Sequence, residues 1–228
     1  MFLILFIILY CNIHIKSLLF SYNKFSRFNT NFILKAKYNS NYINPKHILI
    51  NDHNMPTVYT KNNNYNIKLK KTDFSLEHIY PISHMTKDAK IDMHNLFRTT
   101  KYLNNARSNY KFSDYEEYIL YPNNTWITIN NNITYNKNWV YLENNNYVNH
   151  KKKLFIPSNE SKGIISRAIL YIIYKYNFKL DKVINIDTLL SWYYKYPPTK
   201  NEIYHNNYVK KIQNNDNKFI SCYKKIKI

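Results

Sequence analysis

The sequence has almost no glycine: its 228 residues include one, Gly163. Turns that need a left-handed backbone must therefore use another residue, and asparagine is one of the few that tolerate that conformation. Asparagine is abundant between the apolar segments of this chain. A single retained glycine predicts a position at which the backbone leaves no room for a side chain.

Cysteine is nearly as scarce, with two residues, Cys11 and Cys222. This count excludes a zinc site built from pairs of cysteines. If the N-terminal segment is removed as a leader, no internal disulfide can form either. The fold must then be held by its hydrophobic core, for which a hydrophobic content of 45% is sufficient.

Long hydrophobic runs are also missing. The apolar run of residues 2–10 is too short to cross a bilayer and is typical of a signal-peptide core, although no basic residue precedes it and no Ala-x-Ala site follows. We expect residues 1–20 to be a signal peptide or an N-terminal apolar segment, and the protein to be secreted or to enter the secretory pathway. An uncleaved anchor and an N-terminal core strand are the alternatives.

Acidic residues number 14 against 33 basic ones, which gives a formal charge of +19. Such a charge attracts polyanions, with nucleic acid as the first candidate and an anionic membrane as the second. Lys, Asn, Ile and Tyr share A/T-rich codons, so the excess can also reflect an A/T-rich genome. A membrane-active protein would need an amphipathic basic helix, whereas the stretch AILYIIYKY is apolar on all sides and indicates core. We expect no stable membrane partner.

The elements that the pattern predicts belong to an α+β protein. Residues 21–72 are basic, Asn-rich and irregular, with edge strands allowed in TVYT and YNIKLK. Residues 74–81 are extended and end at Pro81, residues 93–97 form a second short strand, and Thr99 or Thr100 caps a helix through KYLNNARS. The order is strand, loop, strand, helix.

Further along the chain we expect a hairpin and several packed helices. Apolar and polar residues alternate over residues 126–142, which predicts the hairpin. A helix follows with one inward face, a second is capped by Asp187 and stopped by Pro197, and a last helix covers residues 200–214. The inward face consists of Ile165, Ala168, Ile169, Ile172 and Tyr176. We expect one domain over residues 73–222, and a monomer.

The segment SLEHIYP places a carboxylate beside an imidazole, Glu77 and His78. Hydrolysis of a phosphodiester needs a base near neutral pH and a cation that carries the developing charge. On a strand the two side chains diverge, so both can serve one site only at a strand end or a distortion. A helix beneath could add Asn104, and these oxygen donors suit Mg²⁺, Ca²⁺ or Mn²⁺. By itself, a Glu-His pair is more often an ordinary surface feature.

Three separated blocks resemble the endonuclease I family of secreted nucleases, which belongs to the ββα-metal or His-Me finger superfamily. The first block reads LEHIYPIS, DMHNLF and NNARSNYKF, the second FIPSNESKGIISRAILYIIYKY, and the third LLSWYYKYPPTKNE with HNNYVKKIQNNDNKFI. They occur in the family's order over residues 74–220. The family letters of the first block fall on Glu77, His78, Pro81, Ser83, Asp92, His94, Leu96, Asn104, Arg107, Asn109, Tyr110 and Phe112.

The resemblance implies a ββα-metal core and a role for each matching residue. His78 would be the general base, and Glu77 and Asn104 would hold Mg²⁺, with Ca²⁺ or Mn²⁺ as alternatives. Arg107, the second member of the catalytic set, would lie near the phosphate or fix the helix.

Other matching residues would serve binding or support. Lys162 and Arg167 would contact the nucleic-acid backbone, although Arg167 could equally be a salt-bridge partner on a helix surface. The residues that would support the site are Asp92, His94, Asn95 and Asn109.

The implied activity is metal-dependent hydrolysis of phosphodiester bonds in DNA, RNA or both, with little sequence specificity. Arg98 and His205 depart from the family pattern, which often has proline and arginine there. These departures bear on substrate contacts and leave Glu77, His78 and Asn104 unaffected. The alternative is a non-catalytic basic nucleic-acid-binding protein that keeps a nuclease fold.

Overall fold

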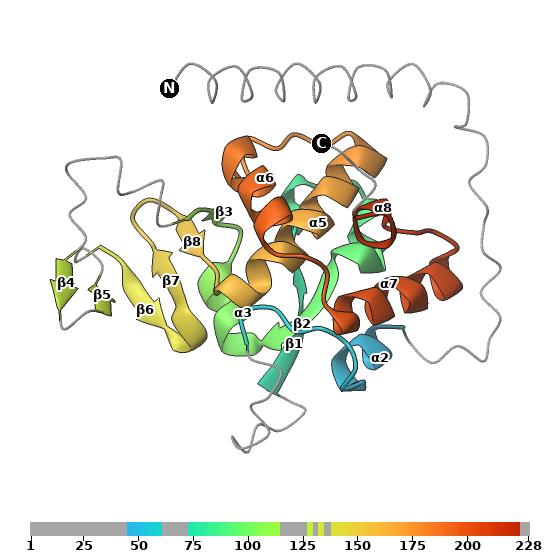
Figure 1. Ribbon diagram of the computed structural model, residues 1–228, viewed down its shortest axis with the longest axis horizontal. Coiled ribbons are helices and arrows are strands. Elements are labelled where there is room, and N and C mark those ends of the chain that lie inside the picture. Colours follow the sequence, from blue (N-terminus) through green and yellow to red (C-terminus); the bar gives the residue numbers. More distant parts are fainter. Residues whose placement is uncertain (1–44, 61–72, 115–126, 130–131, 135–137, 224–228) are drawn as a thin grey trace. The chain divides into compact units, whose positions relative to one another are not determined.

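The computed structural model describes residues 45–60, 73–114, 127–129, 132–134 and 138–223 (Figure 1). They fall within one compact unit, Asn44–Tyr223. This unit begins well before residue 73, where we expected the domain to start. The expected apolar segment of residues 1–20 and the possible edge strand YNIKLK lie outside the described residues.

A two-stranded antiparallel sheet followed by a short helix lies at the centre of the unit (Figure 1). Strand β1 (Phe74–His78) pairs with β2 (Leu96–Thr100), with His78 opposite Leu96. Helix α3 (Lys101–Arg107) follows at once, because the Thr100 side chain accepts a hydrogen bond from the backbone N–H of Leu103. The predicted cap and helix are confirmed.

The second strand begins later than the pattern predicted. Met93–Asn95 form a 3-10 turn, η6, instead of the start of a strand. The side chain of Asp92 accepts a hydrogen bond from the backbone N–H of His94 and stabilises this turn. The predicted strand over residues 93–97 is therefore wrong over its first three positions, and the strand extends to Thr100 instead.

The second sheet has four strands in the order β3-β8-β7-β6. Its members are β3 (Lys111–Phe112), β6 (Val140–Leu142), β7 (Asn146–Asn149) and β8 (Leu154–Ile156). The hairpin predicted over residues 126–142 is correct in part. Strands β4 (Ile127–Ile129) and β5 (Asn132–Thr134) pair with each other, but β6 pairs with β7.

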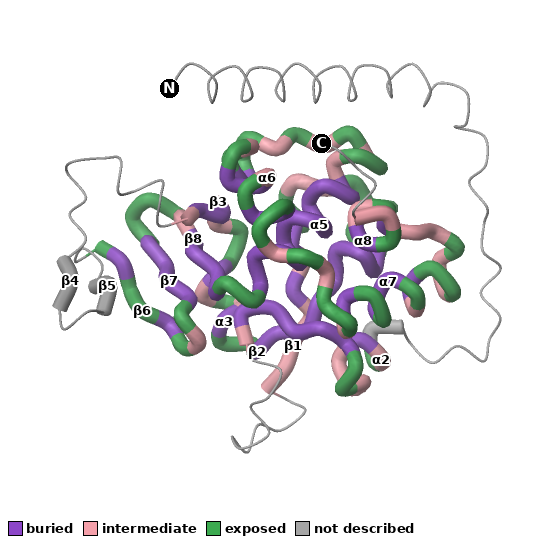
Figure 2. Tube along the Cα trace, viewed as in Figure 1, coloured by how far each residue is buried: buried purple, intermediate pink, exposed green. Residues whose placement is uncertain are grey.

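The C-terminal half of the unit is helical. Its helices are α5 (Asn159–Tyr176), α6 (Ile186–Lys195), α7 (Lys200–Gln213) and α8 (Lys218–Ser221). Helix α5 is buried continuously from Ser161 to Ile172 (Figure 2), more fully than one inward face would require. The cap of α6 is Asn185 and not the predicted Asp187. No helix in the described part of the chain is long and apolar enough to cross a membrane.

Residues before β1 contribute to the same core. Helix α2 (Pro45–Asn51) places Leu49 in a cluster with Met55, Met93, Leu96 and Val209. This cluster joins α2, η6, β2 and α7. Its burial explains why the compact unit includes part of the segment that composition marked as irregular.

The scarcity of glycine has the predicted consequences. Helices α5 and α7 are each followed by an asparagine in the left-handed conformation, Asn177 at φ 55° and Asn214 at φ 54°. Gly163 lies inside α5, where a Cβ atom would come within 2.6 Å of the carbonyl oxygen of Tyr196. The glycine is therefore required by close packing and not by its backbone conformation.

Candidate active site

Glu77 and His78 are the last two residues of β1, where the chain leaves the sheet. Asn95 fixes the backbone that follows the end of β1. Its side-chain amide donates a hydrogen bond to the carbonyl of Tyr80 (2.9 Å), and its oxygen accepts one from the backbone N–H of Tyr80 (2.7 Å). The backbone N–H of Ile79 bonds to the Asn95 carbonyl at 3.1 Å. The pair therefore sits at a fixed strand end, the position at which both side chains can serve one site.

The Glu77 carboxylate is 2% exposed, and one of its oxygens receives two donors. Oε1 accepts a hydrogen bond from the Tyr59 hydroxyl at 3.0 Å and lies 2.9 Å from Nη1 of Arg107. Burial raises the pKa of Glu77 to about 7, while Arg107 and the Tyr59 hydrogen bond oppose the shift. Removal from water thus outweighs the two donors.

Asn104 projects from α3 toward the same face of β1 as Glu77. Its Nδ2 donates to the Ser75 hydroxyl oxygen at 2.9 Å and to the Leu76 carbonyl at 3.1 Å. A carbonyl can only accept, so this contact fixes which end of the amide is nitrogen. Ser75 and Glu77 are two residues apart on a strand and therefore share a face. The amide oxygen of Asn104 is left for another partner.

His78 has a defined ring orientation. Its Nε2 lies 2.9 Å from the carbonyl oxygen of Lys90. Because that oxygen can only accept, Nε2 carries the proton, and in the neutral ring the basic lone pair belongs to Nδ1.

Arg107 connects α3 to the end of β1 from within the protein. The side chain is 1% exposed, donates to the carbonyls of His78 (3.1 Å) and Ile79 (2.6 Å), and forms an ion pair with Glu77. Its guanidinium carbon lies 4.5 Å from the centre of the Phe112 ring. Of the two roles expected for Arg107, these contacts fit that of fixing the helix; burial separates the side chain from any phosphate.

The site fits a hard divalent cation with protein oxygens as ligands. Within the described residues, no hydrogen bond reaches Oε2 of Glu77 or Oδ1 of Asn104, while the other polar atom of each group is bonded. A carboxylate and an amide oxygen are ligands that Mg²⁺ accepts while it keeps several waters. Among the same residues, no group of three or more His, Cys, Asp or Glu side chains could hold a metal. A metal site at this position would use the oxygen of Asn104 beside the carboxylate of Glu77.

Comparison with known sequences decides the family. The sequence model of the family described as Endonuclease I matches residues 12–222. The chain belongs to the Endonuclease I family.

One curated relative shows how far the similarity extends. It is "Endonuclease-1" of Buchnera aphidicola subsp. Baizongia pistaciae (strain Bp), which is 30% identical over 129 residues. The match covers 57% of this chain and 45% of that protein, so the chain spans less than half the length of the relative.

The four residues expected to support the candidate site have different surroundings. Asp92 accepts hydrogen bonds from the hydroxyls of Tyr171 and Tyr176 and forms an ion pair with Lys175. His94 is buried against Tyr171, and Asn95 holds the strand exit described above. Asn109 is exposed in the turn after α3.

Lys162, expected to contact the nucleic-acid backbone, is buried in this structure. The side chain is 2% exposed, and its Nζ lies 2.9 Å from Oδ1 of Asp114. A buried ammonium needs such a partner, since an unpaired charge away from water is strongly unfavourable. The predicted backbone-binding role of Lys162 is therefore not supported.

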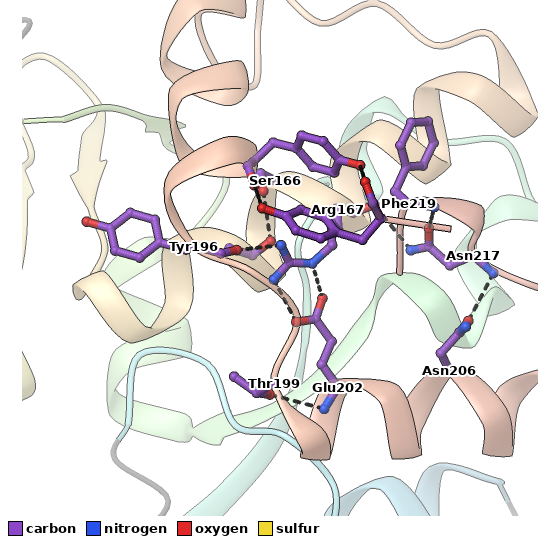
Figure 3. Close-up of polar contacts among 11 residues, drawn as sticks. Ser166, Arg167, Tyr196, Thr199, Glu202, Asn206, Asn217 and Phe219 are labelled. Carbon is purple, nitrogen blue, oxygen red and sulfur yellow. Dashed lines mark hydrogen bonds and ion pairs between the residues drawn. The ribbon is translucent and has the colours of Figure 1, made fainter. Parts of the chain in front are cut away.

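Arg167 is likewise internal, between α5 and α7 (Figure 3). Its guanidinium makes a bidentate pair with Glu202, at 2.6 and 2.7 Å, and donates to the carbonyl of Tyr196 at 2.6 Å. Asn217 donates to the Arg167 carbonyl and is itself bonded to Asn206. The salt-bridge alternative is the correct one, although the pair is buried and not on the helix surface.

Tyr59 is a contact of Glu77 that the sequence did not predict. It lies in the segment of residues 21–72, where composition indicated irregular structure. No local pattern marks it, because its hydroxyl meets Glu77 through tertiary packing across 18 positions of the chain.

Proposed function

We propose that this protein is a metal-dependent nuclease that hydrolyses phosphodiester bonds of DNA, RNA or both, with little sequence specificity. In this proposal β1, β2 and α3 form the ββα-metal core. The observation that carries it is the arrangement at one strand end: the Asn104 amide is bonded to Ser75, which shares a face of β1 with Glu77, and His78 is the next residue.

Each residue has a chemical task in the proposal. His78 takes a proton from the attacking water, and the Lys90 carbonyl holds the ring in the required tautomer. Glu77 and Asn104 hold the cation through hard oxygens, and Mg²⁺ is the expected ion. A divalent ion there would supply electrostatic stabilisation of the phosphate and the leaving oxygen.

Recognition of the substrate rests on charge. With a formal charge of +19, the protein is suited to phosphate contacts, which carry no sequence information. Binding should therefore weaken as the salt concentration rises. Few base-edge contacts are needed, in keeping with low sequence specificity.

The test is replacement of the base. His78→Ala should lower the rate of cleavage of plasmid DNA and total RNA by about 10²- to 10⁴-fold, the usual contribution of a general base. Binding to a labelled oligonucleotide, measured by fluorescence anisotropy, should stay close to that of the wild type. His84→Ala removes a nearby histidine that is not in the proposed site and should leave the rate unchanged.

Two results would refute the mechanism: undiminished cleavage by His78→Ala, and undiminished cleavage by the wild type in excess EDTA. Binding without metal-stimulated turnover in the wild type would favour a non-catalytic nucleic-acid-binding protein.

A further inference from the structure

Tyr59 has an unusual backbone conformation for a large residue. Its φ is 65°, in the left-handed region, and its side chain is completely buried. A bulky residue adopts this conformation only when its surroundings impose it, and such positions are concentrated at functional sites.

Three separate elements hold Tyr59 in place. The backbone N–H donates to the Ser161 hydroxyl oxygen of α5 at 2.7 Å, and the carbonyl accepts from Nδ2 of Asn146 in β7 at 2.7 Å. The ring packs edge-on against Phe155 of β8, with centroids 4.8 Å apart. Both backbone groups and the ring are thus fixed, and the direction of the hydroxyl follows.

That hydroxyl donates to Oε1 of Glu77, the atom that Arg107 also contacts. Two donors at one carboxylate oxygen restrict rotation of the group and leave Oε2 for another partner. The donors differ in charge: Arg107 is cationic, whereas a phenol is neutral at ordinary pH. A second cationic donor would repel a divalent ion at this carboxylate, and a neutral one does not.

We propose that Tyr59 is a positioning residue of the metal site: together with Arg107 it holds Oε1 of Glu77, so that Oε2 is presented with the Asn104 oxygen to a divalent cation. This inference rests on the proposed function. It adds a residue from a segment that none of the family motifs quoted above includes.

The experiment compares two substitutions that each remove one buried hydroxyl. Tyr59→Phe keeps the ring and loses the hydrogen bond to Glu77. Tyr193→Phe is the matched control, because Tyr193 is equally buried and donates to a backbone carbonyl, that of Tyr223, away from the site. Mn²⁺ and Mg²⁺ binding are measured by titration calorimetry without nucleic acid, and melting temperatures are recorded for all proteins.

Tyr59→Phe should weaken metal binding by about 10- to 100-fold, the usual effect of losing a group that orients a ligand. Tyr193→Phe should bind as the wild type does. Cleavage by Tyr59→Phe should approach the wild-type rate at saturating metal, which a general structural defect would not allow. In a Glu77→Gln background, Tyr59→Phe should change metal affinity less than about twofold, since the partner of the hydroxyl is altered.

The outcomes separate the two proposals. A wild type that binds no divalent ion and cleaves equally in EDTA refutes the proposed function. A wild type that binds metal and cleaves, with Tyr59→Phe equal to it in affinity, refutes the role of Tyr59 alone. Equal weakening by Tyr59→Phe and Tyr193→Phe also refutes that role, because it would indicate a general loss of stability.

Discussion

Gly163→Ala is the substitution for which the structure gives the sharpest expectation of stability. In most helices this change is favourable, by about 1 kcal/mol, because alanine has the higher helix propensity. Here the added Cβ atom would lie 2.6 Å from the Tyr196 carbonyl oxygen and 2.6 Å from Nη2 of Arg167. Contacts this short require one of the neighbours to move.

One neighbour, Arg167, forms the buried pair with Glu202, and the other, the Tyr196 carbonyl, is bonded to Arg167 (Figure 3). The Tyr196 carbonyl accepts from Nη1 of Arg167, and the Glu202 carboxylate holds the rest of the guanidinium. Overpacking in a core costs about 1–3 kcal/mol. Breaking a buried ion pair outright costs about 3–5 kcal/mol. We expect Arg167 to be displaced only in part, and the gain in helix propensity offsets some of the cost. The free energy of unfolding should therefore fall by about 2–4 kcal/mol.

For a protein of this size, such a loss lowers the melting temperature by about 4–16 °C. Thermal unfolding followed by circular dichroism measures it, and urea unfolding gives the free energy. Asn207→Ala, at an exposed position of α7, is the control and should be neutral or slightly stabilising. A Gly163→Ala protein as stable as the wild type would show that helix propensity outweighs the close contacts, and would refute this explanation of the solitary glycine.

Two further predictions concern buried cations and pH. Burial lowers the pKa of His205 to about 3. As the pH falls, His205 is therefore protonated in the unfolded chain before it is protonated in the folded protein. Its contribution to stability should be complete above about pH 6.5 and be lost at up to about 1.4 kcal/mol per pH unit toward pH 3. His205→Gln should flatten the change in urea midpoint between pH 7 and 5; an unchanged slope would contradict this. Lys162→Met should keep the wild-type DNA affinity and salt dependence in anisotropy titrations but lower the melting temperature, because the buried ion pair with Asp114 is lost; weaker DNA binding would restore Lys162 as a phosphate contact.

Signals that act over a few residues were sufficient for the strand-helix core. The cap at Thr100 and the helix of α5 depend on neighbours in sequence, and the structure agrees with both. The extended segment predicted as far as Pro81 ends earlier, at His78. The predicted helix cap was wrong where two nearby residues are equally suited to cap the helix. Asn185 and Asp187 are both good helix caps, and only the backbone path selects between them.

The burial of charged groups could not be predicted in this way. Arg167 and Glu202 are 35 positions apart, and Lys162 and Asp114 are 48 apart. Each cation alone looks like a solvated side chain, and its burial becomes acceptable only with a partner that folding brings near. In a chain with so large an excess of basic residues, no local feature distinguishes an internal cation from a surface one.

Asparagine after α5 and α7 also affects the denatured chain. A glycine at Asn177 or Asn214 would adopt the left-handed turn with less strain, yet it would also give the unfolded polypeptide more conformations to explore. A side chain at these positions narrows that ensemble, so folding forfeits less entropy at each turn. A composition that looks unfavourable for making turns thereby contributes to the resistance of this protein to unfolding.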